Sequence, residues 1–316
     1  MIDTVGPLVI GLGEVLWDLF PDAQKPGGAP ANVAFQAGQL GGRGAVASRV
    51  GRGELDRYVD ERGNVFDRLG DRLVSYLGER GLDLSALQRD DRHSTGCVTV
   101  DVSDPHHPRY TIHEGAWDFI AADRALVELA GRADAICFGS LAQRSPDSRA
   151  AIHAALAAAG QECLTVFDVN LRQNWWDIEW ITRSMQAADV LKLNHDEVAT
   201  LAPLMNAPAE PLRFARHAQQ AHGIETVCIT RAEHGCLLVR GDETVDLPGI
   251  KVNVVDAVGA GDAFSAALII ATLRNWPLQN TGELANRVGA LVASRPGAMP
   301  DLREELAGLL TELSPA

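Results

Sequence analysis

Short apolar runs alternate along the chain with segments of helical periodicity. Apolar residues recur every three or four positions over Pro146–Ala159, Glu197–Leu204 and Leu212–His222, which predicts helices. We expect six strands, each a short apolar run: Pro7–Gly13, Ala45–Val50, Ala133–Gly139, Cys163–Val169, Val190–Leu193 and Thr226–Thr230. This strand–helix alternation predicts a mostly parallel sheet with helices on both faces.

Two further segments have a different pattern. Gly96–Val102 and Arg109–His113 alternate apolar and polar residues and are rich in β-branched side chains, which predicts an antiparallel hairpin outside the main sheet. We therefore expect residues 1–316 to form one large α/β domain that carries a small β lid, with lid segments near 14–27 and 93–118. A lid hairpin with exposed edges often pairs across a dimer, so a homodimer through the lid is one expectation.

Composition narrows the class of protein. Hydrophobic residues make up 46% of the chain and charged residues 22%, as in ordinary globular proteins, and the longest apolar runs are too short to span a membrane. A net charge of −14 argues against a nucleic-acid surface. The five cysteines are scattered, form no CxxC pair and accompany no signal sequence, so we expect buried thiols and a cytoplasmic protein.

A glycine-rich corner near the N-terminus reads GGAPANVAFQAGQLGG, residues 27–42. Pro30 suits the first turn of a helix, and Gly41–Gly42 suits its end. Asn32 brings a side-chain donor and acceptor to the first turn, beside accessible glycine amides. This pattern is typical either of a closely packed helix or of a corner that binds a polyhydroxylated ligand, and both interpretations stay open.

A second corner, DAVGAGDAF at residues 256–264, follows a predicted short strand, Lys251–Val255, and precedes a predicted helix, Ala263–Leu273. Unpaired amides at a helix N-terminus favour an anion, so Gly259–Gly261 is a candidate anion site. Asp262 is then either a first-turn acid that stabilises the helix or a general base beside the anion.

Two common nucleotide motifs are missing or incomplete. The chain contains no GxxxxGK[ST] sequence, which excludes a P-loop. GLGEVL at residues 11–16 lacks the third glycine of GxGxxG, so a Rossmann oxidoreductase is disfavoured.

Together, the two glycine-rich corners resemble the two signatures of the ribokinase/PfkB carbohydrate kinases, along nearly the whole chain. Further matches occur in the expected order: GEVLWD (13–18), FDVNLR (167–172), NHDE (194–197), TRAEHG (230–235) and RPGAMP (295–300). The combination is most similar to the fructokinase branch. The resemblance implies a ribokinase-like three-layer α/β/α fold and ATP-dependent phosphorylation of a primary hydroxyl, with fructose as the first choice. Alternatives are 2-keto-3-deoxygluconate kinase, ribokinase, or a regulatory sugar-binding protein without turnover.

The resemblance also implies roles for individual residues. Asp262 corresponds to the general base, the amides of Gly259, Ala260 and Gly261 to the anion hole, and Arg172 to a cation near the transferring phosphate. The sugar-side positions are Asp18, Gly27, Gly28 and Asn32.

The same resemblance places ATP and its ions. The nucleotide-side positions are Asn194, Thr230, Gly235 and Asn286. Glu197 matches a residue that helps to hold Mg²⁺, largely through water. A K⁺ site is implied at Asp256 and the carbonyls of Val258, Val292, Arg295 and Gly297, next to Ala257, where relatives often have threonine. The expected partners are thus a small sugar and ATP.

One segment departs from the family pattern. A D-x-x-G-x-x-L helix start usually follows directly after the Val50–Gly51 position, but here it occurs at Asp67–Gly70–Leu73, after the charged segment Arg52–Phe66. We interpret residues 52–66 as a solvated surface insertion, which loops tolerate at little thermodynamic cost. The alternative is that the segment borders the sugar pocket or a subunit contact.

Overall fold

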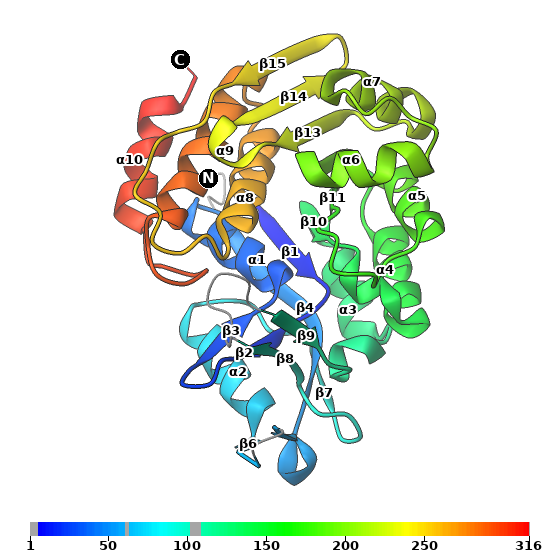
Figure 1. Ribbon diagram of the computed structural model, residues 1–316, viewed down its shortest axis with the longest axis vertical. Helices are drawn as coiled ribbons and strands as arrows, with labels where there is room; N and C mark the ends of the chain where they lie inside the picture. Colours follow the sequence, from blue (N-terminus) through cyan, green and yellow to red (C-terminus); the bar gives the residue numbers. More distant parts are fainter. Residues whose placement is uncertain (1–5, 61–62, 102–108, 316) are drawn as a thin grey trace.

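A large central sheet forms the body of the computed structural model, which describes residues 6–60, 63–101 and 109–315 (Figure 1). In the described chain this sheet has nine strands in the order β15-β14-β13-β12-β11-β10-β1-β4-β7. Neighbours from β13 to β7 are parallel, and β14 and β15 form an antiparallel edge. The strands are β1 Leu8–Leu12, β4 Arg43–Gly51, β7 Leu87–Asp90, β10 Ala135–Phe138, β11 Leu164–Asp168, β12 Val190–Asn194, β13 Thr226–Thr230, β14 Cys236–Arg240 and β15 Glu243–Leu247.

Helices cover both faces of this sheet (Figure 1). One layer contains α3 Arg124–Ala130, α4 Pro146–Ala158, α5 Ile178–Gln186, α6 His195–Leu204 and α7 Pro211–His222. The other contains α1 Ala29–Gln39, α8 Ala260–Leu273, α9 Leu278–Ala293 and α10 Arg303–Leu313. Short 3-10 turns lie at Gly53–Leu55, Ala116–Phe119, Leu141–Arg144 and Ala232–His234.

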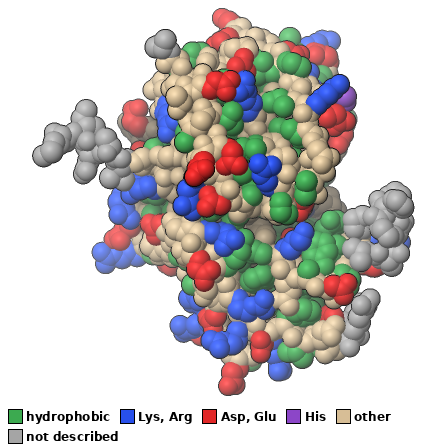
Figure 2. Space-filling model, turned by 90° about the vertical axis from the view of Figure 1, so that its left-hand side faces the viewer, with side chains coloured by type: hydrophobic (Ala, Val, Ile, Leu, Met, Phe, Trp, Pro, Cys, Tyr) green, Lys and Arg blue, Asp and Glu red, His purple; other side chains and the backbone are tan. Residues whose placement is uncertain are grey.

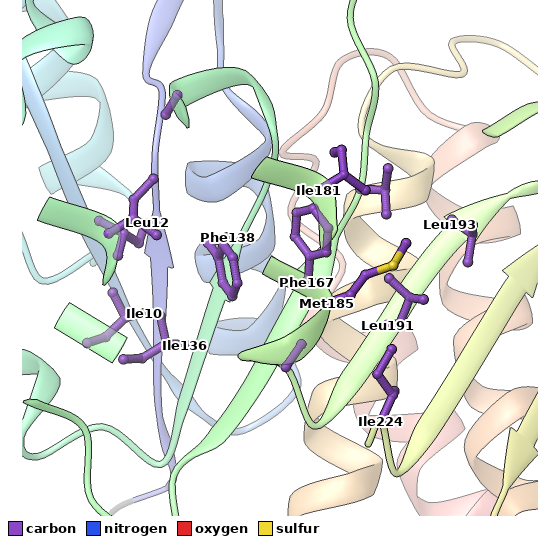
Figure 3. Packing of buried hydrophobic residues seen from close by; sticks show 14 of the residues in the cluster. Ile10, Leu12, Ile136, Phe138, Phe167, Ile181, Met185, Leu191, Leu193 and Ile224 are labelled. Atoms are coloured by element: carbon purple, nitrogen blue, oxygen red, sulfur yellow. The ribbon is translucent and has the colours of Figure 1, made fainter. Parts of the chain in front are cut away.

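Successive residues of the central strands pack against opposite helical layers. On β10, Ile136 and Phe138 belong to the core beneath α3–α7, whereas Ala135 and Cys137 belong to the core beneath α1 and α8–α10. Figure 3 shows the first of these cores, where Phe138 stacks on Phe167 of the neighbouring strand with ring centroids 5.2 Å apart. A strand buried on both faces has no polar face, which explains its continuous apolar sequence.

A separate small sheet forms the lid, with strand order β3-β2-β8-β9 (Figure 1). Its strands are β2 Leu16–Leu19, β3 Gln24–Gly27, β8 Gly96–Asp101 and β9 Arg109–Ile112. The antiparallel pairing of β8 with β9 confirms the predicted hairpin, except that Val102 lies outside the described residues. A side-chain amide of Gln173 donates to the carbonyl of Tyr110 at 2.5 Å, which ties β9 to the loop after β11.

The segment after β4 is anchored more deeply than its charged sequence predicts. It contains the short antiparallel strands β5 Arg57–Val59 and β6 Val65–Asp67, and α2, Leu69–Glu79, follows it. Asp67, the first residue of the D-x-x-G-x-x-L match, is exposed at the end of β6. Instead the buried Asp56 accepts hydrogen bonds from the amides of Gly70 and Thr95, so it joins the first turn of α2 to the lid. A helix does start where the D-x-x-G-x-x-L match indicates, and the acid that accepts from Gly70 comes from inside the segment 52–66.

Most predicted elements are found within a few residues of their expected bounds. Lys251–Val255 is an exception: it forms no strand, and several of its side chains are exposed on the path from β15 to α8. The strand prediction from its valines is therefore wrong, because no neighbouring strand pairs with this segment. Helix α8 begins at Ala260, three positions before the predicted start, and Asp262 lies in its first turn as expected.

Three further features are the surface charges, the cysteines and the lengths of the helices. Basic and acidic side chains are interspersed over the face shown in Figure 2. The five cysteines are buried and free. Across the described part of the chain, no helix has the length and apolar character needed to cross a membrane.

Candidate active site

The predicted site residues gather at the carboxyl ends of the parallel strands, where the lid meets the body. Asp168 is the last residue of β11, and it pairs in register with Lys192 on β12. Asn194 at the end of β12 pairs in register with Thr230 at the end of β13. The N-terminus of α8 arrives at the same edge, which is where parallel α/β sheets bind their ligands.

The first turn of α8 presents main-chain amides toward this edge. Gly259 caps the helix with φ 80°, and a Cβ atom there would lie only 2.6 Å from that of Ala298, so only glycine fits. Within the described residues, the amides of Gly259 and Gly261 have no acceptor, and that of Ala260 makes a long bond of 3.3 Å to the carbonyl of Ala257. Unpaired amides at a helix N-terminus attract an anion.

Asp262 stands beside these amides and is partly buried. Its Oδ2 accepts a hydrogen bond of 2.7 Å from Nδ2 of Asn32. Burial raises the pKa of Asp262 to about 6, against the opposing effects of the Asn32 bond and of the nearby Lys192 and Arg172 charges. The carboxylate is therefore ionised at neutral pH, yet more basic than an exposed aspartate.

Asn32 links this carboxylate to the glycine corner of α1. The side chain is buried, and its Oδ1 has no hydrogen-bond partner in the described structure. Gly28 caps α1 with φ 117°, and a Cβ atom there would lie 2.4 Å from the carbonyl oxygen of Glu14. The close approach of the two segments thus requires glycine, and it leaves an unsatisfied acceptor facing the corner.

Asp18 on β2 completes the sugar-side group. Its Oδ2 would lie 2.9 Å from a Cβ atom on Gly27, so the carboxylate adjoins the glycine corner. Burial raises the pKa of Asp18 to about 6, while the positive charges of Arg172 and Lys25 oppose the rise. The structure brings Asp18, Gly27, Gly28 and Asn32 together.

Arg172 is exposed, and the one hydrogen bond of its guanidinium among the described residues is a long contact of 3.4 Å to the carbonyl of Leu171. A surface ion pair is the alternative role for this residue, but none of the described carboxylates pairs with it. Burial raises the pKa of Glu14, Asp18 and Asp262, and the charge of Arg172 opposes the rise in each. The guanidinium is therefore free to bind an anion near the base.

Sequence reasoning missed Glu14 as a site residue. Its side chain is only 6% exposed, and burial raises its pKa to about 7, with the charge of Asp262 adding to the rise. The signal was present in LGEVLW, where Glu14 stands inside an otherwise apolar run. A buried acid of this kind needs either a partner or a function.

A buried cluster was also missed. Lys192 Nζ lies 2.9 Å from both carboxylate oxygens of Asp168, and the Ser265 hydroxyl donates to Oδ2 at 2.7 Å. All three side chains are buried. The sequence VLKLN places a lysine inside an otherwise apolar predicted strand, which could have indicated a buried partner.

Asn194 and Glu197 form a capping box at the start of α6. Asn194 Oδ1 accepts from the Glu197 amide at 2.9 Å, and Glu197 Oε2 accepts from the Asn194 amide at 2.8 Å. The other Glu197 oxygen accepts from the Leu171 amide at 2.7 Å. Both carboxylate oxygens are thus held by the main chain, and this arrangement fits a water-mediated contact to Mg²⁺ better than direct ligation. The described residues contain no group of three or more His, Cys, Asp or Glu suited to hold a metal.

The remaining nucleotide-side residues lie around the turn between β13 and β14. Thr230 ends β13, and Gly235 has φ 91°, with the carbonyl of Leu247 too close for any side chain. Asn286 on α9 donates to the carbonyl of Pro248 at 3.4 Å. These residues flank one surface next to Asn194.

Asp256 gathers the segments of the implied K⁺ site. Its oxygens accept from the amides of Val258 at 3.1 Å and Gly297 at 3.2 Å, and Lys25 of the lid lies 3.4 Å away. Burial opposes the charge, but these amides hold the pKa of Asp256 below its usual value. The carbonyl of Val292 already accepts from the Arg295 amide, whereas those of Val258 and Gly297 are free in the described structure.

Comparison with known proteins places this site in a family. Residues 21–305 match the pfkB family carbohydrate kinase model. Escherichia coli fructokinase is 29% identical, over 93% of this chain and 96% of its own. A Pyrococcus horikoshii sugar kinase solved with ATP has TM-score 0.77 and 26% identity, covering 96% of this chain and 100% of that one. A Vibrio cholerae fructokinase solved with fructose, ADP and potassium has TM-score 0.77 and 25% identity, covering 98% and 100%. The chain belongs to the pfkB family of carbohydrate kinases.

Proposed function

We propose that this kinase transfers the γ-phosphoryl group of ATP to a primary hydroxyl of a small sugar, with fructose as the first choice. The position of Asp262 carries the proposal. Its carboxylate is held by Asn32 at 2.7 Å, has a pKa raised to about 6, and adjoins two unpaired helix amides. This combination suits a general base next to an anion hole.

The site contains residues for sugar binding and for proton removal. The sugar binds in the corner of Asp18, Gly27, Gly28 and Asn32, where carboxylate and amide oxygens accept hydroxyl hydrogens. Asp262 takes the proton of the attacking hydroxyl, whose oxygen forms the new bond to the γ-phosphorus as the bond to the β-phosphate oxygen breaks.

The charge that develops on the phosphoryl group needs stabilisation. The amides of Gly259, Ala260 and Gly261 form the anion hole, and Ala260 must exchange its long bond to Ala257 for one to the phosphate. Arg172, unpaired in the described structure, adds a charge-assisted contact.

ATP binds over Asn194, Thr230, Gly235 and Asn286. Glu197 would hold the water ligands of Mg²⁺, which would neutralise part of the charge of the phosphates. Asp256 and the nearby carbonyls of Val258, Val292, Arg295 and Gly297 would hold K⁺ behind the anion hole, as potassium accompanies ADP in the Vibrio cholerae fructokinase.

Fructose is favoured because curated fructokinases from several organisms match over more than nine-tenths of this chain. A second candidate is 2-keto-3-deoxygluconate, because the unpaired Arg172 acts on both Asp18 and Asp262 and could bind a sugar carboxylate. Ribose is the third candidate, by family resemblance.

A sugar panel tests the proposal. Purified protein with ATP, Mg²⁺ and K⁺ should release ADP with fructose, and less with 2-keto-3-deoxygluconate or ribose. Asp262→Asn should lose most of the turnover while it still binds sugar and ATP in calorimetry. The matched control is Asp147→Asn, an exposed first-turn acid of α4, which should keep full turnover. Normal turnover by Asp262→Asn would exclude the base assignment, and a wild type that binds a sugar without turnover would support the regulatory alternative.

A further inference from the structure

A buried ammonium group lies directly behind the anion hole. Lys192 projects from β12 and is 7% exposed, and its Nζ donates to both oxygens of Asp168 at 2.9 Å. Ser265 on α8 donates to one of the same oxygens, so the pair is fixed from two elements. The carboxylate takes two of the three ammonium hydrogens, which leaves one without an acceptor among the described residues.

The orientation of this pair directs its positive end toward the anion hole. A Cβ atom built on Gly261 would lie 3.5 Å from Lys192 Nζ, and no other heavy atom within 4 Å of that point is found beyond the neighbouring backbone. The Asp168 oxygens are therefore farther from Gly261 than the ammonium is. The positive charge thus lies nearer than its counter-ion to the side of Gly261 where a Cβ atom would stand.

The ammonium keeps its proton at all working pH values. Burial opposes the charge, but the carboxylates of Asp168 and Glu197 raise the pKa of Lys192 above its ordinary value. A buried ion pair rarely stabilises a fold more than apolar side chains of the same size would. Its presence at this place therefore needs a reason other than stability.

We propose that Lys192 is a positioning residue of the phosphoryl-transfer site, a fixed cation that Asp168 and Ser265 hold behind Gly261 to stabilise the anion hole and the ionised form of Asp262. The inference rests on the proposed function, since it assumes transfer at Gly259–Gly261. Lys192 acts through the main chain of α8 and needs no contact with ATP. It supplies a buried positive charge in a chain that has no P-loop lysine.

Opposite charge changes provide the test. The groups that face Asp262 are Asn32, Asp168, Lys192, Arg172 and Glu14. Lys192→Met removes a cation that lowers the pKa of Asp262, so kcat should fall about 100-fold. The acid limb of its pH profile should also move up by about one unit. Asp168→Asn removes an anion that raises the same pKa, so its acid limb should move down. A merely structural pair would not give shifts of opposite sign.

A matched control comes from a remote ion pair. Arg49 on β4 lies 2.6 Å from the fully buried carboxylate of Asp90, away from α8. Arg49→Met should reduce the thermal stability but leave the acid limb of kcat in place. The inference would be overturned if the acid limb of the kcat–pH profile lay at the same pH in Lys192→Met, Asp168→Asn and wild type.

Two further variants test the inference if Lys192→Met fails to fold. If Lys192→Met does not fold, Lys192→Arg should retain most of the turnover and Ser265→Ala should lower kcat without raising the sugar KM. Full loss in Lys192→Arg together with unchanged kcat in Ser265→Ala would overturn the inference. A wild type that is inactive on every sugar would instead contradict the proposed function, so the two failures are distinguishable.

Discussion

The hydrogen bond between Asn32 and Asp262 should set the acid limit of activity. As the proposed general base, Asp262 must be ionised to accept a proton, so activity should be present above its pKa and be lost as the pH falls through about 6. Asn32→Leu removes the 2.7 Å bond to the ionised carboxylate while it keeps the branching and the number of heavy atoms of the side chain. The loss should raise the pKa of Asp262, because this bond favours the charged form.

The size of the shift follows from the type of bond. A hydrogen bond to a charged group contributes about 1.5–3 kcal/mol, and one pKa unit corresponds to about 1.4 kcal/mol, so the pKa should rise by about one to two units. At pH 6.5 about three-quarters of wild-type Asp262 is ionised, against about a tenth at a pKa of 7.5. Turnover at pH 6.5 should therefore fall about eightfold, and it should recover near pH 9.

The assay is ADP release between pH 5 and pH 9 at saturating sugar and ATP, so that weaker sugar binding does not affect kcat. Asn280→Leu is the control, because Asn280 is also a first-turn asparagine with one hydrogen bond, to the carbonyl of Leu313 at 3.0 Å. Its acid limb should equal that of wild type. An Asn32→Leu acid limb that also stays in place would refute the reasoning about the base.

Three further predictions concern stability. Glu14→Gln should raise the free energy of unfolding by about 3 kcal/mol at pH 8 and leave it unchanged near pH 4, as measured by denaturant titration. Burial raises the pKa of Glu14 in the folded protein from 4.5 to about 7, so the wild type loses stability as the pH rises between these two values. Asp56→Ala leaves two buried amides without an acceptor and should lose about 2–4 kcal/mol, whereas the exposed Asp67→Ala should change stability by under about 0.5 kcal/mol. Gly28→Ala should lower the melting temperature sharply because of its φ of 117° and a main-chain oxygen 2.4 Å from the new Cβ atom, while Gly160→Ala, with open space around it, should not.

The body of the fold could be predicted because each central strand has two buried faces. Strands such as Thr226–Thr230 then read as continuous apolar runs, and helical periodicity follows them. The antiparallel edge strand β15 gave no such signal, since its sequence ETVDL is half exposed. Lys251–Val255 shows the converse error, in which a suitable sequence finds no strand to pair with.

The glycine corners and Asp262 could be predicted because their chemistry is local. A helix start, its free amides and its first-turn acid all lie within a few residues of one another. The Asp168–Lys192 pair could not be predicted by spacing, because its partners are 24 residues apart and meet only through the register of β11 and β12. The contact of Asp56 with Gly70 could not be predicted for the same reason, since the β5–β6 hairpin separates the two residues in the sequence.

The charges of the site bear on the choice of sugar. Five carboxylates and three cations, Lys192, Arg172 and Lys25, lie around it, so the pocket is acidic before ATP binds; the carboxylates are Glu14, Asp18, Asp168, Glu197 and Asp262. Burial raises the pKa of Glu14, Asp18 and Asp262, and such groups accept hydrogen bonds from hydroxyls but oppose a further negative charge. Lys192 is already held by Asp168 and Lys25 by Asp256, so among the described residues of the site Arg172 remains for an anion. If the transferring phosphoryl group takes that arginine, the corner favours a neutral polyol, which is the physical reason to rank fructose above an acidic sugar.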